Sequence, residues 1–395
     1  MISVNEKKKE CCGCGACSQI CHMGCITMCQ DSEGFLYPVT DVEKCIRCNR
    51  CNQVCPIENA QKVCKESKEL RQPLTYGAWH KDDTVRDNSS SGGAFTLFAE
   101  HIIAQGGVVY GCALDEDMKA FHIGVDDICE LDKLRGSKYV QSKIEDTYVK
   151  VKSDILAGKK VLFVGTPCQA AGLYYFLGKR KHDNLYIVDF ICHGVPSPKV
   201  FEEYIGHLER KYDSKIVSFK FRNKDYGWSQ TGLQLGTKVK FANGKFLRKY
   251  PAFKDSFMNG FLDDIYLRPS CYECQFKSLP KEYADFTIAD FWGVDKVSKR
   301  LNDKKGTSLI LVHSKQGENM WKLINDKCYF EKVSFESAIR RNKSLIQSAK
   351  INPKRNNFYY DFEERGYSYV ERKYMSVFQW ASHKILKMRK QLIQR

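Results

Sequence analysis

Two cysteine runs within the first sixty residues have the residue type and the spacing of iron–sulfur ligands. The first run follows the pattern C-x2-C-x2-C-x3-C, and the second repeats it with Pro56 directly after its last cysteine. The first run consists of Cys11, Cys14, Cys17 and Cys21, and the second of Cys45, Cys48, Cys51 and Cys55. Two-residue gaps let a tight loop wrap one cubane, and two such runs are typical of chains that bind two [4Fe-4S] clusters. We therefore expect two clusters in this segment.

The two runs are expected to share ligands, because in this pattern the fourth cysteine of each run crosses to the other cluster. One predicted cluster is held by Cys11, Cys14, Cys17 and Cys55, and the other by Cys21, Cys45, Cys48 and Cys51. The segment is thus predicted to be a ferredoxin module. A pair of zinc sites is the alternative, but zinc ribbons usually join one C-x2-C to a distant second one. Two departures from the pattern are the extra thiol of Cys12 and His22 in place of the usual proline.

A later cysteine pair, Cys271 and Cys274, forms a lone C-x2-C motif. Two cysteines need two more ligands to close a site. Cys168 and Cys192 are the candidates, because each follows the carboxyl end of a predicted parallel strand, where α/β folds bind ligands. These four cysteines are predicted to hold a third [4Fe-4S] cluster. The alternatives are a structural zinc and four unrelated thiols, since free cysteine is commonly buried.

A Ser/Gly loop precedes the apolar helical run 96–104. Such a loop presents backbone N–H groups and the positive end of a helix dipole to an anion. The candidates for holding the pyrophosphate of a dinucleotide such as FAD are Ser90, Ser91, Gly92 and Gly93. The alternative is an ordinary helix N-cap, where Ser and Gly are also favoured.

These candidates lie in a pattern of alternating helices and strands. Helix 144–156 leads to the apolar strand 160–165, and strand 185–191 leads to helix 199–212. Thr166 is the expected N-cap of the helix after the first strand, since a proline follows it. Strand–helix units of this length predict a parallel α/β sheet. The cysteines that follow the two strands should therefore be spatial neighbours.

Downstream segments alternate in polarity and indicate further strands, with a hairpin turn at Asn243-Gly244. These strands are predicted at 216–221, 233–241, 245–250, 284–293 and 308–313. We expect the first three to be antiparallel and to cover one edge of the sheet. The expected fold class is an α+β ferredoxin module, followed by an α/β domain with a largely parallel sheet plus antiparallel additions and a helical C-terminal tail.

The chain is expected to divide into four parts, because a polar, lysine-rich stretch separates the cysteine runs from the α/β pattern. The parts are a ferredoxin domain 1–60, a linker 61–74, a flavin- and cluster-binding α/β domain 75–330 and a basic helical extension 331–395. The α/β domain is further expected to consist of an N-terminal part 75–158 and a C-terminal part 159–330.

Composition indicates a globular protein of a reducing compartment. The chain has 395 residues, of which 43% are hydrophobic, enough for two or three domains with their own cores. Its 19 cysteines are an odd number, which fits a disulfide scaffold poorly, and cluster chemistry needs reducing conditions. No apolar signal core begins the chain and no apolar run is long enough to span a membrane. We therefore expect a cytoplasmic protein.

The formal net charge of +16 favours acidic partners. Near the end of the chain, basic residues alternate with apolar ones, at Lys384, Lys387, Arg389, Lys390 and Arg395 against Ile385, Leu386, Met388, Leu392 and Ile393. This pattern predicts an amphipathic helix that lies on an anionic membrane surface or docks on a partner. A solvated helix packed on its own domain is the alternative. We expect no nucleic-acid partner, because the sequence indicates neither a recognition helix nor a basic–aromatic stripe.

Six motifs together resemble the coenzyme F420 hydrogenase/dehydrogenase beta-subunit family, in the version with an N-terminal two-cluster ferredoxin. The motifs are SSGGAF (90–95), RGSKYVQS (135–142), GTPCQ (165–169), ICHGVPSP (191–198), CYEC (271–274) and ADFTIADFWG (284–293). With the cysteine runs they follow the family's order over residues 1–295, and together they are far more specific than any single one. The remaining residues match no motif of the family.

The resemblance implies a flavoprotein, with FAD in the α/β domain and the third [4Fe-4S] cluster close to it. It implies that Lys138 pairs with a flavin phosphate or the ring and that Tyr139 lies beside the cofactor; a surface lysine and a core aromatic are the alternatives. Asp290 and Trp292 either line the flavin or cluster pocket or simply end a strand. His193 is a candidate proton donor, with a structural histidine as the alternative. Lys138 and His193 are thus the candidate catalytic residues.

The resemblance further implies an oxidoreductase. It would pass electrons between a hydride-carrying small molecule and a partner redox protein or soluble electron carrier, through FAD and [4Fe-4S] clusters. The hydride carrier of the family is coenzyme F420, while a nicotinamide or another organic substrate stays open. The rival is a non-catalytic ferredoxin-type electron carrier fused to a docking domain, which predicts iron and sulfide but no flavin.

Overall fold

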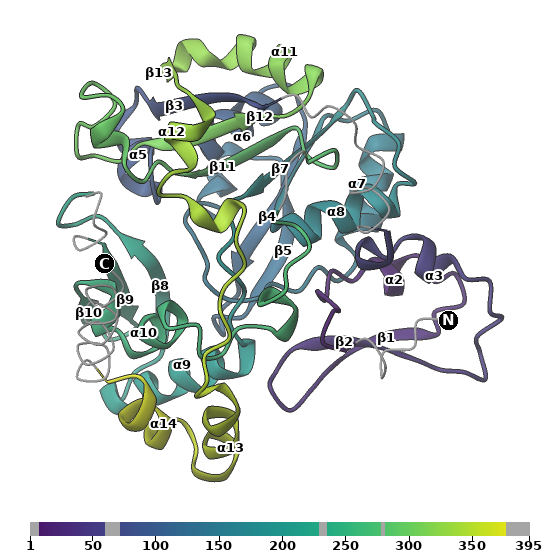
Figure 1. Cartoon of the computed structure of the whole chain (residues 1–395), viewed down its shortest axis with the longest axis vertical. Coiled ribbons are helices and arrows are strands. Elements are labelled where there is room, and N and C mark those ends of the chain that lie inside the picture. Colours follow the sequence, from purple (N-terminus) through teal and green to yellow (C-terminus); the bar gives the residue numbers. More distant parts are fainter. Residues whose placement is uncertain (1–7, 60–71, 229–234, 278–280, 377–395) are drawn as a thin grey trace, which may run out of the picture.

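The computed structural model describes residues 8–59, 72–228, 235–277 and 281–376, and its largest element is an eight-stranded sheet. The strands lie in the order β13-β3-β12-β11-β7-β6-β4-β5 (Figure 1). Four adjacent strands run parallel, and they are β4 (Val108–Leu114), β6 (Val161–Gly165), β7 (Leu185–Phe190) and β11 (Phe286–Asp290). The flanking strands are antiparallel, and they are β3 (Leu74–His80), β5 (Ala120–Val125), β12 (Ser308–Val312) and β13 (Cys328–Lys332). The predicted parallel core is confirmed, and the sheet takes strands from both predicted parts of the α/β domain.

Helices cover both faces of this sheet. On one face α6 (Ala94–Ile103) and α11 (Lys315–Ile324) pack in a core with side chains of the central strands. On the other face lie α7 (Thr147–Leu156) and α8 (Pro167–Phe176). Thr166 caps α8 as predicted, because its side chain accepts from the Gln169 amide in a capping box. The start of α8 is thereby fixed at the carboxyl end of β6.

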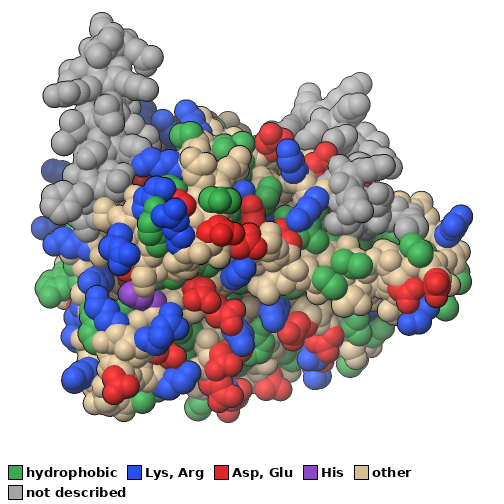
Figure 2. Space-filling model, turned by 90° about the horizontal axis from the view of Figure 1, so that it is seen from below, with side chains coloured by type: hydrophobic (Ala, Val, Ile, Leu, Met, Phe, Trp, Pro, Cys, Tyr) green, Lys and Arg blue, Asp and Glu red, His purple; other side chains and the backbone are tan. Residues whose placement is uncertain are grey.

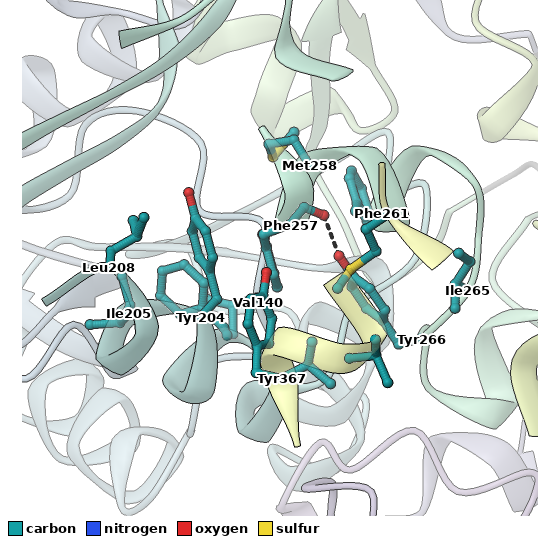
Figure 3. Packing of buried hydrophobic residues seen from close by; sticks show 14 of the residues in the cluster. Val140, Tyr204, Ile205, Leu208, Phe257, Met258, Phe261, Ile265, Tyr266 and Tyr367 are labelled. Carbon is teal, nitrogen blue, oxygen red and sulfur yellow. Dashed lines mark hydrogen bonds between the residues drawn. The ribbon is translucent and has the colours of Figure 1, made fainter. Parts of the chain in front are cut away.

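The three predicted antiparallel strands form a separate sheet rather than extending the large one. They are β8 (Ile216–Asn223), β9 (Gly236–Phe241) and β10 (Phe246–Lys249), and β9 and β10 are joined by the predicted Asn-Gly turn. This small sheet shares a core with α9 (Pro198–Tyr212) and α10 (Ser256–Leu262). The core is rich in aromatic rings, and within it the Tyr266 hydroxyl donates to the Phe257 carbonyl (Figure 3). The inward side chains of β8 find their partners in this aromatic core, so the strands do not need the large sheet.

The N-terminal segment folds into two short helices and a two-stranded antiparallel sheet. Its elements are α2 (Ala16–Gln19), β1 (Ile26–Gln30), β2 (Leu36–Thr40) and α3 (Arg50–Gln53). Gly15 and Asn49 precede the two helices in left-handed conformations, which Gly and Asn adopt readily. The segment is the purple part of Figure 1, and α2 contacts α7 and α8. That this α+β unit is a ferredoxin module stays a prediction.

The C-terminal region is helical as predicted and carries α12 (Phe335–Ile339), α13 (Arg355–Arg365) and α14 (Tyr367–Tyr374). α14 packs on α13 and α9. The predicted basic amphipathic helix at 384–395 lies outside the described residues, as does most of the predicted linker. The remaining helical turns are α5 (Asp83–Asn88), η1 (Ile128–Lys133), η2 (Ala252–Lys254), η3 (Pro269–Cys271), η4 (Val294–Lys296), η5 (Asn325–Lys327) and η6 (Lys343–Leu345). Within the described ranges no helix has the length and apolar character needed to cross a membrane.

Candidate functional site

A cavity of about 1110 Å³ opens where the parallel strands of the large sheet end. Residues that follow β6, β7 and β11 line it, among them Thr166, Cys192, His193, Asp290 and Trp292. Open α/β sheets bind their ligands at this edge. Small-molecule sites usually have volumes of roughly 300–1,000 Å³. This cavity is therefore large enough for a cofactor-sized ligand.

The Ser/Gly loop lies in the cavity wall because it is held tightly between β3 and β12. The Gly92 amide donates to Ser308 Oγ over 3.1 Å, and a Cβ at this position would lie 2.5 Å from the Ala78 carbonyl oxygen. Gly93 is the N-cap of α6 with a φ of +89°, a conformation that favours glycine. Both glycines are thus required by close packing and backbone conformation. They place the N-terminus of α6 at the cavity.

The two serines of the loop line the same wall. Ser90 Oγ accepts from the amide and from the hydroxyl of Ser137, at 2.8 and 3.0 Å. Ser91 Oγ donates to the Thr307 carbonyl over 2.7 Å. The hydroxyls therefore fasten the loop to its neighbours, while the helix end beside them carries the positive end of the α6 dipole.

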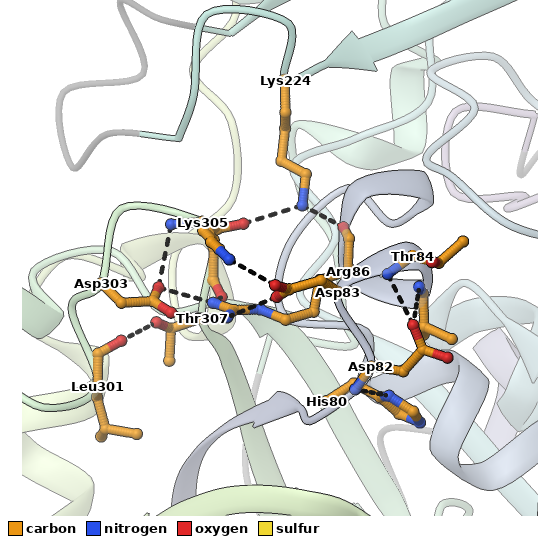
Figure 4. Close-up of polar contacts among 12 residues, drawn as sticks. His80, Asp82, Asp83, Thr84, Arg86, Lys224, Leu301, Asp303, Lys305 and Thr307 are labelled. Carbon is orange, nitrogen blue, oxygen red and sulfur yellow. Dashed lines mark hydrogen bonds and ion pairs between the residues drawn. The ribbon is translucent and has the colours of Figure 1, made fainter.

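Hydrogen bonds and ion pairs of Lys224 and Arg86 hold this loop in place (Figure 4). Lys224 Nζ donates to the carbonyls of Ser91 and Lys305, at 3.0 Å each, and to that of Arg86. Burial, helped by the neighbouring Arg86 charge, lowers the pKa of Lys224 to about 8. Arg86 in turn makes a bidentate pair with Asp303, at 2.6 and 2.7 Å. The loop is thereby connected to β8 and to the segment before β12.

Lys138 lines the cavity with its stem, while its ammonium group is directed at the end of η1. Nζ donates to the carbonyls of Lys133, Leu134 and Arg135, at 3.1, 2.9 and 2.8 Å. Burial lowers the pKa of Lys138 to about 8. The side chain therefore closes the C-terminal turn of η1 and adds positive charge to the cavity wall.

Arg222 joins two of the predicted cofactor residues, and sequence reasoning missed it. Its two terminal nitrogens donate to the Asp290 carboxylate at 2.9 and 3.0 Å, and one of them also donates to Tyr139 Oη at 2.9 Å. The guanidinium lies over the Trp292 ring, which stacks on Trp228 with 5.3 Å between centroids. Buried Nε of Arg222 has no hydrogen-bond partner in the part of the chain that the structure describes.

His193 lines the cavity and is held by an aspartate that the sequence did not single out. Nε2 lies 2.5 Å from Asp264 Oδ1, and the ring meets the edge of Phe261. About a third of the side chain is exposed, 36%. The imidazole is therefore both oriented and accessible.

The predicted third cysteine set comes together beside this cavity. The thiols of Cys168, Cys192, Cys271 and Cys274 interact electrostatically with one another. Burial raises the pKa of Cys192 to about 12; the Cys168 and Cys274 thiols add to this rise, and Lys277 opposes it. Cys192 itself lines the cavity, so the set lies directly at the cavity wall. β6 and β7 are adjacent and parallel, which is why the cysteines after them meet.

The eight cysteines of the N-terminal segment fall into two groups. Cys21, Cys45, Cys48 and Cys51 line one small cavity. The thiols of Cys11, Cys14, Cys17 and Cys55 interact electrostatically with one another. Cys25, which lies outside both predicted cysteine runs, lines the first group's cavity with its Sγ 3.3 Å from that of Cys21. Cys17 also interacts with Cys51 of the first group, and both the assignment of ligands to two clusters and metal binding by these residues stay predictions.

Cys12, the extra thiol, lies between two of the three cysteine sets. It is buried and interacts with the thiols of Cys14 and Cys168. In the described ranges, no three or more His, Cys, Asp or Glu side chains are arranged around a single metal ion. A four-iron cluster differs from such an ion, because each iron takes its own thiolate and the thiolates surround a larger volume.

Comparison with known proteins gives one family match, which covers the chain from β6 to α12. The family model for the C terminus of the coenzyme F420 hydrogenase/dehydrogenase beta subunit matches residues 158–338. No match is found among curated proteins. Among solved structures the chain is similar to one from the xenon-derivatised F420-reducing [NiFe] hydrogenase complex of Methanosarcina barkeri, with 15% identity, a TM-score of 0.47, and coverage of 76% of this chain and 94% of that one. Residues 158–338 are thus similar to the C-terminal part of the coenzyme F420 hydrogenase/dehydrogenase beta subunits.

Proposed function

We propose that this chain is an iron–sulfur flavoprotein oxidoreductase. One observation carries the proposal: a single cavity has the Ser/Gly loop and the Arg222 network in one part of its wall and Cys192 in another. A dinucleotide in this cavity would lie next to the third cysteine set. The similarity of residues 158–338 to a hydrogenase/dehydrogenase subunit supports redox chemistry at this place.

Different residues at the cavity wall would hold each of the proposed cofactors. The phosphates of FAD would be held by Ser90, Ser91 and Gly93 at the start of α6, with Gly92 behind them bonded to Ser308, and the remaining part of FAD would lie along Lys138, Tyr139 and Asp290. Cys168, Cys192, Cys271 and Cys274 would hold one [4Fe-4S] cluster, and the two N-terminal groups would hold two more. When bound, a flavin takes up or gives a hydride in one two-electron step and exchanges single electrons with iron–sulfur centres.

The proposed catalytic residues contribute a proton and a charge. The Asp264 carboxylate lies within hydrogen-bond distance of His193 Nε2 and orients the ring, so His193 is the proposed proton donor. Lys138 keeps a positive charge at the wall, where it would stabilise negative charge on a flavin phosphate or ring. Apolar side chains such as Phe261 and Met258 line the same cavity and limit the access of water.

The hydride carrier that we propose is an anionic molecule such as coenzyme F420, or alternatively a nicotinamide. The exposed side chains of Arg340, Arg341 and Lys343 lie at the cavity and would attract acidic groups. Elsewhere basic and acidic side chains are interspersed, as on the face shown in Figure 2. The family description names a beta subunit, so we propose a partner redox protein as the second electron carrier. The cytoplasm is the proposed location, since cluster chemistry needs a reducing compartment.

The test is anaerobic purification with flavin, iron and sulfide quantified per chain. We expect one FAD with roughly twelve iron and twelve sulfide atoms. Cys192→Ser should remove roughly four of the iron atoms, whereas the control Cys129→Ser, at an exposed thiol, should remove none. Full cofactor content would be followed by a screen of reduced F420 and nicotinamides as hydride donors. Absence of flavin with roughly eight iron atoms would contradict the proposal and favour the electron carrier.

A further inference from the structure

The N-terminal segment is fastened to the α/β domain by a buried arginine next to a cysteine. Arg268 is fully buried. Its Nε donates to the Cys11 carbonyl over 2.7 Å, and Nη2 contacts Cys11 Sγ at 3.7 Å and the Leu36 carbonyl at 2.9 Å. The guanidinium lies over the Tyr37 ring at 4.2 Å and near Phe35 at 5.5 Å. A permanent positive charge is thus enclosed among apolar rings beside one thiol.

Gln141 completes the contact and explains the glycine between the first two ligand positions. It accepts from Arg268 Nη1 over 3.0 Å and donates to the Cys12 carbonyl over 3.1 Å. A Cβ on Gly13 would lie 2.8 Å from Arg268 Nη1 and 2.9 Å from Gln141 Nε2. The backbone of the first cysteine loop therefore passes directly over these two side chains. Only a residue without a side chain allows so close an approach.

The same arginine also reaches the third cysteine set through its backbone. Its carbonyl accepts from the Cys271 amide over 2.9 Å, and its own amide donates to the Val195 carbonyl over 2.9 Å. The Val195 amide in turn donates to Cys271 Sγ at 3.4 Å. Arg268 therefore connects a thiol of the N-terminal segment with the loop that carries Cys271. Cys12, between Cys14 and Cys168, marks the same approach of the two sets.

We propose that Arg268 is a positioning residue that fixes the distance between the first and third cysteine sets and raises the reduction potential of the centre bound through Cys11. The proposal rests on the proposed function, because it assumes that both sets hold clusters. Adding one electron to a cluster adds one negative charge, and the guanidinium keeps its proton throughout. Arg268 therefore stabilises the reduced state more than the oxidised state. Its effect is strong because apolar surroundings screen the charge weakly.

The test compares three variants of the anaerobically purified full chain by dithionite titration with EPR detection. Arg268→Gln should lower the ratio of reduced to oxidised protein at one centre about tenfold, which equals ~59 mV for a one-electron couple. Arg268→Lys keeps the positive charge but loses the planar set of guanidinium donors. It should change the ratio of reduced to oxidised protein at the same centre by less than Arg268→Gln does. Arg355→Gln is the matched control: it removes a buried arginine that pairs with Glu33 of the same segment and, among the residues that the structure describes, contacts no thiol. We expect Arg355→Gln to change the ratio of reduced to oxidised protein by less than twofold at every centre.

Three outcomes would overturn the proposal. The ratio of reduced to oxidised protein in Arg268→Gln could stay within twofold of wild type at every centre, Arg268→Lys could shift the same centre as far as Arg268→Gln does, or Arg355→Gln could shift that centre equally. The last result would assign the effect to docking instead of charge. Amide hydrogen exchange of residues 11–19 can be measured whether or not the protein holds iron. Arg268→Gln should make exchange in these residues faster. If wild-type protein holds no iron, the proposed function fails. The positioning role of Arg268 is then tested by amide hydrogen exchange alone. It is refuted if Arg268→Gln leaves the exchange of residues 11–19 unchanged.

Discussion

Asp290 is predicted to act mainly by neutralising Arg222, and the substitution Asp290→Asn tests this role. The carboxylate makes two charged hydrogen bonds to the guanidinium, at 2.9 and 3.0 Å, and accepts a weaker one from Trp228 at 3.4 Å. Only 7% of the Arg222 side chain and 16% of the Asp290 side chain are exposed. An asparagine keeps the shape, but it turns one acceptor into a donor that faces another donor. The arginine charge would then remain buried without its counter-ion.

The expected loss follows from this burial. Removing one partner of a buried ion pair typically lowers the free energy of unfolding by about 3–5 kcal/mol. Because both side chains keep a little solvent contact, we expect about 3 kcal/mol for Asp290→Asn, near the lower end of that range. The double variant Arg222→Gln/Asp290→Asn removes both charges and should regain about 2 kcal/mol relative to the sum of the single variants.

Urea unfolding at pH 7, followed by tryptophan fluorescence, measures these differences. Trp228 and Trp292 stack beside the pair and report on it directly. Asp225→Asn is the control, because Asp225 contacts Lys238 and Arg248 on the same small sheet while its side chain is 37% exposed. Exposed pairs contribute at most about 1 kcal/mol. The reasoning is refuted if Asp290→Asn costs no more stability than Asp225→Asn. Loss of flavin at unchanged stability would instead make Asp290 a direct cofactor ligand.

Three further predictions concern the cavity wall. Gly92→Ala would place a Cβ 2.5 Å from the Ala78 carbonyl, so we expect about 2 kcal/mol lower stability and loss of bound flavin; unchanged flavin content would contradict this. Burial lowers the pKa of His122 to about 4, so the unfolded chain, with a histidine pKa of about 6.5, binds the proton first. Stability should therefore fall as the pH decreases from about 6.5 to about 4, and His122→Gln should flatten this slope in urea titrations at several pH values. Lys138→Met leaves three carbonyls without their donor and should lower stability by about 2 kcal/mol; an unchanged urea midpoint would argue against the capping role.

Local patterns in the sequence determined a large part of the fold. The apolar runs at 160–165 and 185–191 became adjacent parallel strands, β6 and β7, and Thr166 caps α8 as its position before a proline predicted. Such features depend on periodicity and on neighbours within a few residues, so they can be recognised along one dimension. The cysteine spacing likewise predicted which thiols lie together, because a two-residue gap limits how far a short loop can reach.

The tertiary structure alone decided which distant residues meet. We expected β8 to β10 to cover an edge of the large sheet. They form a sheet of their own instead, because their apolar faces pack with α9 and α10. Alternation predicts that a segment is a strand, but it carries no information about the partner strand.

The pairing of charged side chains could likewise not be predicted from the sequence. Arg222 and Asp290 are 68 positions apart, and Arg268 and Cys11 are 257 apart. Nothing in the neighbouring residues tells an arginine on a strand or loop which carboxylate or thiol it will face, since the pairing arises only after distant elements pack. The sequence therefore determined the types of groups available for chemistry, and the packing of the two sheets with the N-terminal segment decided how those groups are held and charged.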